Sequence, residues 1–266
     1  MDEHAALLTI DAGNRATKAA RWERVPDLPG RAPAPSGEAC VGHDGSARRA
    51  LSDFARGARS AFVSCVASSD VRLTVADALA DVDVPLVEPP HGLDLASVRN
   101  VHTIGADRLF AARGAFALLG RACLVVDAGT AVTVDAVAHS DSHAAAFLGG
   151  AIAPGPDLLR AALGRGAAQL FEVEIGAFDL DAVPALGRES AEALRSGVVH
   201  GFRGAVRELV RRVASEAGLD GAPVVVAGGA SPWLLADGGV FGGDVVVAAH
   251  VVHLGLLEAA RGAGLA

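Results

Sequence analysis

Two short segments of the sequence combine residue types that bind phosphate. Each is an apolar run followed by Asp-Ala-Gly and a small polar residue, and the two aspartates are Asp11 and Asp127. A glycine in such a turn lets consecutive backbone N–H groups point into one concavity, and the carboxylate beside it can hold a divalent cation that bridges phosphate oxygens. Lys18 follows the first segment at a spacing from which its ammonium could reach a terminal phosphate. These residues favour polyphosphate binding, while the alternative is a pair of ordinary hairpin turns.

The same two segments form an internal repeat. They align without a gap, so that Thr17 corresponds to Thr133. Repetition of a strand and a turn at this separation indicates a duplicated chain. We therefore expect two similarly built lobes that face each other, formed by residues 1–119 and residues 120–266.

A third segment, Gly105-Ala106-Asp107-Arg108, stands at the start of an expected helix. Glycine permits the close approach of a ligand, a helix N-terminus favours anions, and the adjacent Asp and Arg offer a proton acceptor beside an anion clamp. The alternative is a helix-entry aspartate next to a solvated arginine. The two common nucleotide loops do not fit, because Lys18 lacks the flanking Gly and Ser/Thr of a Walker A loop and no Gly-x-Gly-x-x-Gly follows the first apolar run.

The elements that must position these segments alternate along the chain. Short apolar runs alternate with Ala/Leu/Arg-rich stretches of helical period, which predicts an α/β protein. The expected strands are residues 7–10, 61–66, 84–87, 123–126, 132–137, 144–152, 223–227 and 245–248. The expected helices are residues 46–56, 70–80, 105–119 and 189–217 and a last one from Val251. The Pro- and Gly-rich stretch 25–44 predicts an irregular loop or an edge hairpin.

The composition indicates a globular protein. Of the 266 residues, 51% are hydrophobic and 20% are charged, which excludes intrinsic disorder. No apolar run approaches the ~18 residues needed to span a bilayer, and the start Met-Asp-Glu-His is unlike a basic signal peptide, so we expect a cytoplasmic protein without a membrane partner. The net charge of −8, without a Lys/Arg block, argues against nucleic acid as the main partner. Lys18 is the only lysine of the chain and lies in the first phosphate segment.

Four segments, taken in order and spacing, resemble the type III pantothenate kinase family over nearly the whole chain. They are Asp11-x-Gly-Asn-x-x-x-Lys18, Gly105-Ala-Asp-Arg108, Asp127-Ala-Gly-Thr130-Ala-Val-Thr133 and Gly149-Gly-Ala-Ile-Ala-Pro-Gly155. The resemblance implies an α/β protein with two similar lobes of the actin-like/ribonuclease H-like duplicated kinase fold, with ATP in the cleft between them, and a homodimer. The implied reaction is the ATP-dependent phosphorylation of pantothenate to 4′-phosphopantothenate, the first step of coenzyme A biosynthesis.

The resemblance also implies a role for individual residues. Asp107 would be the catalytic proton acceptor, and Asp127 would hold a monovalent cation, K⁺ or NH₄⁺. Asp11 would in addition place Mg²⁺ through water. The residues implied in binding ATP and its phosphates are Asp11, Gly13, Asn14, Arg15, Thr17, Lys18, Gly129 and Thr130. Those implied in binding pantothenate are Gly105, Ala106, Asp107, Arg108 and Ser190.

The sequence departs from the family pattern at three places. Ser190 stands where the family often has a threonine that touches substrate, and Arg15 stands where Thr or Ser is common. A tyrosine often found upstream of the Gly-x-Asp-Arg segment is absent, because the chain contains no tyrosine. Two alternatives are a related small-molecule kinase and a catalytically silent regulatory protein of the same fold. The presence of all three aspartates, Asp11, Asp107 and Asp127, favours retained catalysis.

Overall fold

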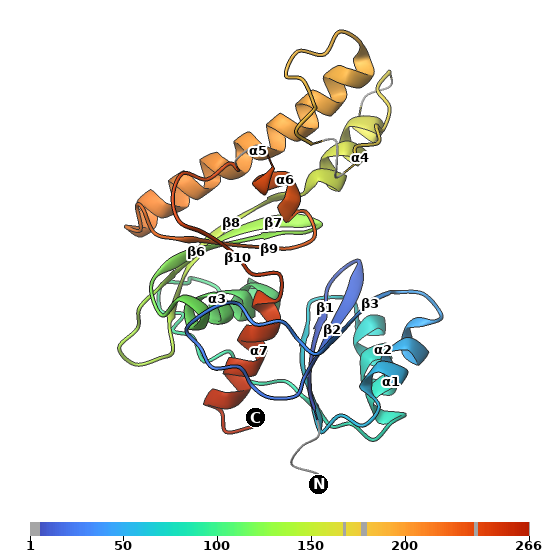
Figure 1. Cartoon of the computed structure of the whole chain (residues 1–266), viewed down its shortest axis with the longest axis vertical. Helices are drawn as coiled ribbons and strands as arrows, with labels where there is room; N and C mark the ends of the chain where they lie inside the picture. Colours follow the sequence, from blue (N-terminus) through green and yellow to red (C-terminus); the bar gives the residue numbers. More distant parts are fainter. Residues whose placement is uncertain (1–5, 167–168, 177–179, 237–238, 266) are drawn as a thin grey trace. The chain divides into compact units, whose positions relative to one another are not determined.

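The computed structural model describes residues 6–166, 169–176, 180–236 and 239–265 (Figure 1). The chain divides into two compact units. The first consists of Met1–Arg121, Val137–Leu148 and His250–Ala266, and the second consists of Ala122–Ala136 and Gly149–Ala249. Within the described ranges, no helix combines the length and the apolar character needed to cross a bilayer.

The first sheet has five strands in the order β3-β2-β1-β4-β5. Strand β2 is antiparallel to both β1 and β3, whereas β4 is parallel to β1 and β5. Helices α1 and α2 pack on one face, over a core that includes Leu8 and Ile10, and helices α3 and α7 contact β4, with α7 also contacting β1. The bounds of the elements in this part of the chain are β1 Leu7–Ala12, β2 Ala16–Trp22, β3 Gly37–Gly42, α1 Ala47–Ala55, β4 Ser60–Cys65, α2 Ser69–Ala80, β5 Leu86–Val87, η1 Val101–Thr103, α3 Ala106–Leu119 and α7 Val251–Gly262.

The second sheet repeats this arrangement. Its order is β10-β9-β6-β7-β8, so in both sheets the first strand is central, the next two lie on one side and the last two on the other. Strand β9 is parallel to β6 and to β10. The bounds are β6 Cys123–Ala128, β7 Ala131–Ala138, β8 Ala146–Pro154, α4 Pro156–Gly166, α5 Ser190–Ala217, β9 Val224–Ala227, α6 Ser231–Leu235 and β10 Val245–Val247. The matching strand orders confirm the predicted α/β duplication.

Helices α3 and α7 of the first unit pack backbone against backbone. A Cβ atom at Gly114 of α3 would collide with the carbonyl oxygen of Val251, and one at Gly255 of α7 would collide with the carbonyl oxygen of Phe110. Each of these glycines therefore lies against the backbone of the other helix, at a point where no side chain fits. Because of this close contact, the position of α3 depends on α7.

A buried polar group connects α7 to the first sheet. His253 is 4% exposed, and its Nδ1 lies 2.9 Å from Thr9 Oγ1, which also accepts a hydrogen bond of 2.8 Å from Trp22 Nε1. Burial lowers the pKa of His253 to about 3, and the neighbouring charges of His250 and Lys18 act in the same direction. His253 is therefore neutral in the folded protein over the whole physiological range.

This histidine should make stability depend on pH. Because its pKa is depressed on folding, the unfolded chain binds the extra proton below about pH 6.5, and the free energy of unfolding should fall by about 1.4 kcal/mol per pH unit from there toward pH 3. We expect His253→Gln to flatten this part of the profile in urea unfolding measured between pH 7 and pH 4.5. The exposed His200, changed to Gln, is the control, and parallel profiles for wild type and His253→Gln would contradict the prediction.

The strands and helices expected from the sequence are largely present, and the structure contains further elements that the sequence did not predict. Strand β2 and helices α4 and α6 were not expected. Strand β2 has an irregular burial pattern with charged residues at Lys18 and Arg21, and α4 begins in a Gly-Pro context that is typical of loops. For the stretch 25–44, the sequence predicted an irregular loop or an edge hairpin, and the structure has the edge strand β3 at Gly37–Gly42.

Candidate functional site

The first Asp-Ala-Gly segment forms the hairpin between β1 and β2. The N–H of Gly13 donates a hydrogen bond of 3.1 Å to the carbonyl of Ala16, and Asn14 and Arg15 are exposed at the tip. The strand register pairs Asp11 directly with Lys18. Because paired residues of neighbouring strands project to the same face, the carboxylate and the only ammonium side chain of the protein lie side by side.

Thr17 lies on the opposite face of the same strand. Its side chain is 2% exposed, and Oγ1 is 3.3 Å from Nε2 of His43. A small cavity on that face is lined by Thr17 and His43 together with residues of α1 and α2. The hydroxyl of Thr17 and the ammonium of Lys18 therefore project from opposite sides of the sheet.

The second Asp-Ala-Gly segment forms a turn that is one residue shorter. Here the N–H of Gly129 donates a hydrogen bond of 3.0 Å to Ala131, the first residue of β7, whereas the equivalent acceptor in the first turn is Ala16. The gapless sequence alignment is therefore wrong beyond the glycine. Lys18, rather than Thr17, corresponds to Thr133, because the first turn contains one extra residue that the similarity of two threonines conceals.

Neither turn glycine is required by the backbone around it. Gly13 and Gly129 do not have positive φ angles, and a Cβ atom on either would approach only one carbonyl oxygen, at 3.5 Å. A distance of 3.5 Å is an ordinary contact, so a larger residue could be accommodated by the protein itself. Apart from this oxygen and the adjacent residues, no atom of the described residues lies within 4 Å of either Cβ position.

Two other glycines hold the second turn in place. The N–H of Gly155 donates a hydrogen bond of 3.0 Å to the carbonyl of Thr130, and a Cβ atom there would strike the carbonyl oxygen of Gly129. Gly228 has a φ of +88°, and a Cβ atom on it would collide with the carbonyl oxygen of Ala128 and lie 2.5 Å from Oδ1 of Asp127. Asp127, at the end of β6, is thus packed directly against the glycine turn that follows β9.

Asp107 is the second residue of α3, and its side chain is partly buried. Burial raises the pKa of this carboxyl group, against the opposing effects of the Arg108 N–H, which donates a 2.8 Å hydrogen bond to Oδ1, and of the Arg108 charge. The Arg108 guanidinium in turn lies over the ring of Phe147, 5.5 Å from its centroid. A carboxylate with a raised pKa is a stronger base, which suits a proton acceptor.

The Asp107 segment and the first turn lie at the same end of the first sheet. The N–H groups of Val66 and Ala67, just beyond β4, both donate to the carbonyl of Ala12 at the end of β1. Val66 also lies beside Gly105, the residue that caps α3, at 3.6 Å from the position a Cβ atom would take. The structure therefore brings Asp11 and Asp107 to one region of the first unit.

Ser190 is an exposed residue at the first position of α5. From Ser190 to Phe202 the helix axis rises by about 18 Å. Phe202 packs edge-on against Trp233 of α6, which follows the Gly228 turn. Within the second unit, Ser190 therefore lies about three turns of α5 away from the part of this helix that contacts α6.

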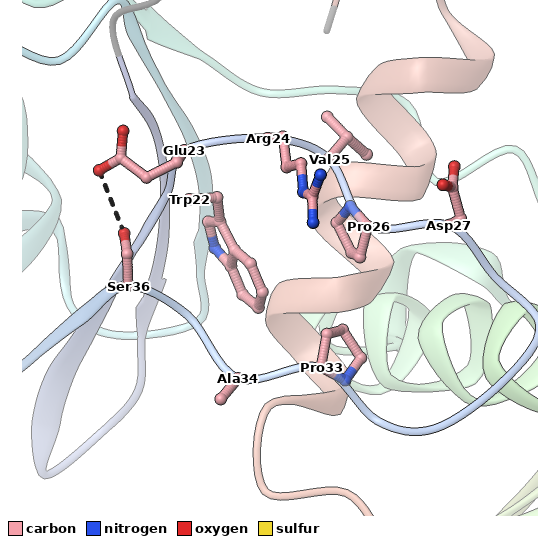
Figure 2. A pocket seen from close by; sticks show the side chains of 9 residues that line it. All are labelled: Trp22, Glu23, Arg24, Val25, Pro26, Asp27, Pro33, Ala34 and Ser36. Carbon is pink, nitrogen blue, oxygen red and sulfur yellow. Dashed lines mark hydrogen bonds between the residues drawn. The ribbon is translucent and has the colours of Figure 1, made fainter.

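A larger pocket of about 430 Å³ lies elsewhere in the first unit (Figure 2). It is lined by Trp22, the loop that follows β2 and Ser36, whose Oγ donates a hydrogen bond of 3.4 Å to Glu23. Trp22 is four residues beyond Lys18 along β2, which is about 13 Å for an extended strand. None of the site residues predicted from the sequence lines this pocket.

The position of Asp107 leads to a prediction about Gly105. A Cβ atom at Gly105 would collide with Oδ1 of Asp107, the far end of a side chain that can rotate away. Gly105→Ala should therefore displace the carboxylate at little cost to the fold. We expect kcat to fall by about 10-fold or more while the free energy of unfolding changes by less than about 1 kcal/mol. An unchanged kcat would show that the observed carboxylate position is not needed.

Comparison with solved structures places the chain in a fold class. It matches a Baf-family protein from Campylobacter jejuni with a TM-score of 0.59 and 16% identity, covering 97% of this chain and 98% of that one. It matches the Lmo2764 protein from Listeria monocytogenes with a TM-score of 0.51 and 13% identity, covering 96% and 97%. These similarities concern the fold alone. With the two sheets of matching strand order, they define an α/β protein of a duplicated, two-sheet fold.

Sequence comparison specifies the family. The type III pantothenate kinase family model matches residues 7–212. A type III pantothenate kinase from Aromatoleum aromaticum is 36% identical over 238 residues, which is 86% of this chain and 88% of the relative. The enzymes of the same name from Thermobifida fusca and Streptomyces griseus are 40% and 38% identical, but the matches span only 57% and 58% of their lengths. The chain belongs to the type III pantothenate kinase family.

Proposed function

We propose that this protein phosphorylates pantothenate with ATP to give 4′-phosphopantothenate, the first step of coenzyme A biosynthesis. The observation that carries the proposal is Asp107, a carboxylate whose pKa is raised by burial, placed beside Arg108 at the same end of the sheet as the Asp11–Lys18 pair. This combination supplies a proton acceptor and phosphate-binding charges in one unit. Family membership supports the choice of pantothenate as the acceptor.

The two turns are proposed to bind ATP. The absence of side chains at Gly13 and Gly129 suits the close approach of phosphate oxygens to the two turns, and the Lys18 ammonium suits the charge of a terminal phosphate. Thr130 would add a hydroxyl contact to the nucleotide. Gly13, Asn14, Arg15 and Thr17 belong to this segment, with Thr17 supporting β2 from the opposite face.

Two cations fit the same residues. Carboxylate oxygen is the ligand type that Mg²⁺ prefers, so Asp11, next to Lys18, would hold Mg²⁺ through water, and Asp127, packed against Gly228, would hold K⁺ or NH₄⁺. When bound, Mg²⁺ neutralises charge on the transferred phosphoryl group. The protein's own part is to orient these carboxylates on strand ends that are fixed by sheet hydrogen bonds.

Asp107 would act directly on the acceptor. Its carboxylate accepts the proton of the pantothenate primary hydroxyl while that oxygen forms a bond to the γ-phosphorus of ATP, and the bond from this phosphorus to the bridging oxygen breaks to release ADP. Arg108, with Gly105 and Ala106, would bind pantothenate, and Ser190 would contribute a hydroxyl. Lys18 and the turn N–H groups stabilise the charge on the phosphoryl oxygens.

The direct test is an ADP-release assay with pantothenate, in the presence and absence of K⁺, with the product identified by mass. We expect turnover that depends on pantothenate, on ATP with Mg²⁺ and on a monovalent cation. Absence of turnover under both conditions would overturn the proposal. Nucleotide binding without turnover would instead support a silent, regulatory protein of the same fold.

Family resemblance also supports a homodimeric, cytoplasmic enzyme without a nucleic-acid or membrane partner. Light scattering on the purified chain tests the first of these. A mass of one chain at micromolar concentration would contradict the dimer.

A further inference from the structure

The hydroxyl group of Ser64 is buried and unsatisfied within the part of the chain that the structure describes. The residue is 2% exposed, and its Oγ has no hydrogen-bond partner among the residues that the structure describes. Leaving a buried polar group unsatisfied costs roughly 1–3 kcal/mol, so native proteins keep few of them without a reason. Neither the sequence pattern nor the proposed function assigned a role to Ser64.

The strand register places this hydroxyl in the proposed phosphate site. In the parallel pair of β1 and β4, Ser64 stands directly opposite Asp11, and on the other side of β1, Lys18 stands directly opposite Asp11. Neighbouring strands are about 4.8 Å apart. Lys18, Asp11 and Ser64 therefore form a row of three adjacent side chains on one face of the sheet, which contains a cation, an anion and a neutral hydroxyl.

The row lies at the end of the sheet next to α3. Val66, two residues beyond Ser64, lies beside Gly105, which precedes Asp107. The preceding residue on this face of β4 is Phe62, which is fully buried and apolar. The hydroxyl of Ser64 is thus a short polar group at the inner edge of the site.

We propose that Ser64 is a positioning residue that accepts a hydrogen bond from a water ligand of the divalent cation held at Asp11. The inference deepens the proposed function and rests on it for the identity of the cation. Mg²⁺ retains several water ligands when it accompanies nucleotide phosphates, and each bound water needs hydrogen-bond acceptors. A serine oxygen close to the sheet, one strand from the carboxylate, supplies such an acceptor without adding charge.

Ser52 provides a matched control. It is also a buried serine of the first unit, but its Oγ donates to the carbonyl groups of Arg48, at 2.9 Å, and Ala78, at 3.0 Å. It belongs to α1, which packs on the opposite face of the sheet. Removal of the Ser64 hydroxyl should therefore weaken cation binding without a loss of stability, whereas removal of the Ser52 hydroxyl should lower stability without an effect on cation binding.

The experiment compares Ser64→Ala and Ser52→Ala in the full chain. Thermal unfolding without ligand measures stability, and titration of Mn²⁺ with ADP, followed by the electron paramagnetic resonance of free Mn²⁺, measures cation affinity. Ser64→Ala should leave the unfolding midpoint unchanged or raise it, and should weaken Mn²⁺·ADP binding by about 10-fold. Ser52→Ala should lower the midpoint and leave Mn²⁺·ADP affinity within about 2-fold of wild type.

Several outcomes would overturn the inference. Mn²⁺·ADP affinity that is unchanged in Ser64→Ala would show that the hydroxyl has no role toward the cation. A loss of stability like that of Ser52→Ala, with unchanged affinity, would identify a structural hydroxyl satisfied by an internal water. Turnover of pantothenate by the wild type is measured separately: if it is present while Ser64→Ala is indistinguishable, only the Ser64 inference fails. If turnover is absent while Mn²⁺·ADP binding depends on Ser64, only the proposed function fails.

Discussion

Replacement of Asp107 by asparagine is expected to lower kcat with pantothenate by at least about 100-fold. Asparagine keeps the size of the side chain. Its amide oxygen can still accept a hydrogen bond from the Arg108 N–H, which in the native protein donates a hydrogen bond of 2.8 Å to Oδ1 of Asp107. What it loses is the ability to take a proton, which burial strengthens in Asp107 by raising its pKa. The first turn is untouched, so nucleotide binding measured by calorimetric titration should remain near the wild-type value.

Asp70 is the control for this substitution. It is the second residue of α2, as Asp107 is of α3, but it is exposed. Asp70→Asn removes the same charge from an equivalent helix position, so any general effect on a helix N-terminus appears in both variants. A kcat for Asp107→Asn that stays within a few-fold of Asp70→Asn would mean that Asp107 is not the base.

The second large effect is expected from Gly255→Ala. A Cβ atom at this position of α7 would collide with the carbonyl oxygen of Phe110 and lie 2.6 Å from its carbonyl carbon, and neither atom can rotate away. The two helices must separate, which should lower the free energy of unfolding by about 3 kcal/mol or more. Urea unfolding followed by circular dichroism measures this change. Activity should also fall, because α3 carries Asp107.

Gly201→Ala tests the same chemical change in an open environment. Gly201 lies in α5, and a Cβ atom there would meet nothing within 4 Å. Alanine is the better helix former by about 1 kcal/mol, so this variant should be slightly more stable than wild type. A similar response of the two variants would refute the proposed collision between α7 and α3.

The sequence allowed the prediction of the features that repeat or alternate. The apolar runs before Asp11 and Asp127 predicted the two central strands, and the repeat predicted two sheets of the same design, which the strand orders confirm. These signals are visible in sequence because buried strands require consecutive apolar residues. The residue types at Asp107 and Lys18 led to the acid–base and phosphate-binding roles, which stay predictions.

Other features depend on distances that the sequence does not contain. The extra residue in the first turn became visible only through the hydrogen bonds to Ala16 and Ala131, because Thr17 and Thr133 look equivalent. Ser64 was missed because a serine in a strand is unremarkable until its hydroxyl is found without a partner. The contact between Phe202 of α5 and Trp233 of α6 likewise has no local signal in the sequence.

The discontinuous first unit has a consequence for biosynthesis. Helix α3 emerges from the ribosome long before α7, yet its Gly114 packs against the backbone of α7, which follows the whole second unit in the chain. Until α7 has been made, α3 lacks this native partner at Gly114. The second unit can complete its fold first, although its sequence begins later. We expect nascent chains stalled before Val251 to have a protease-sensitive first unit and a protected second unit.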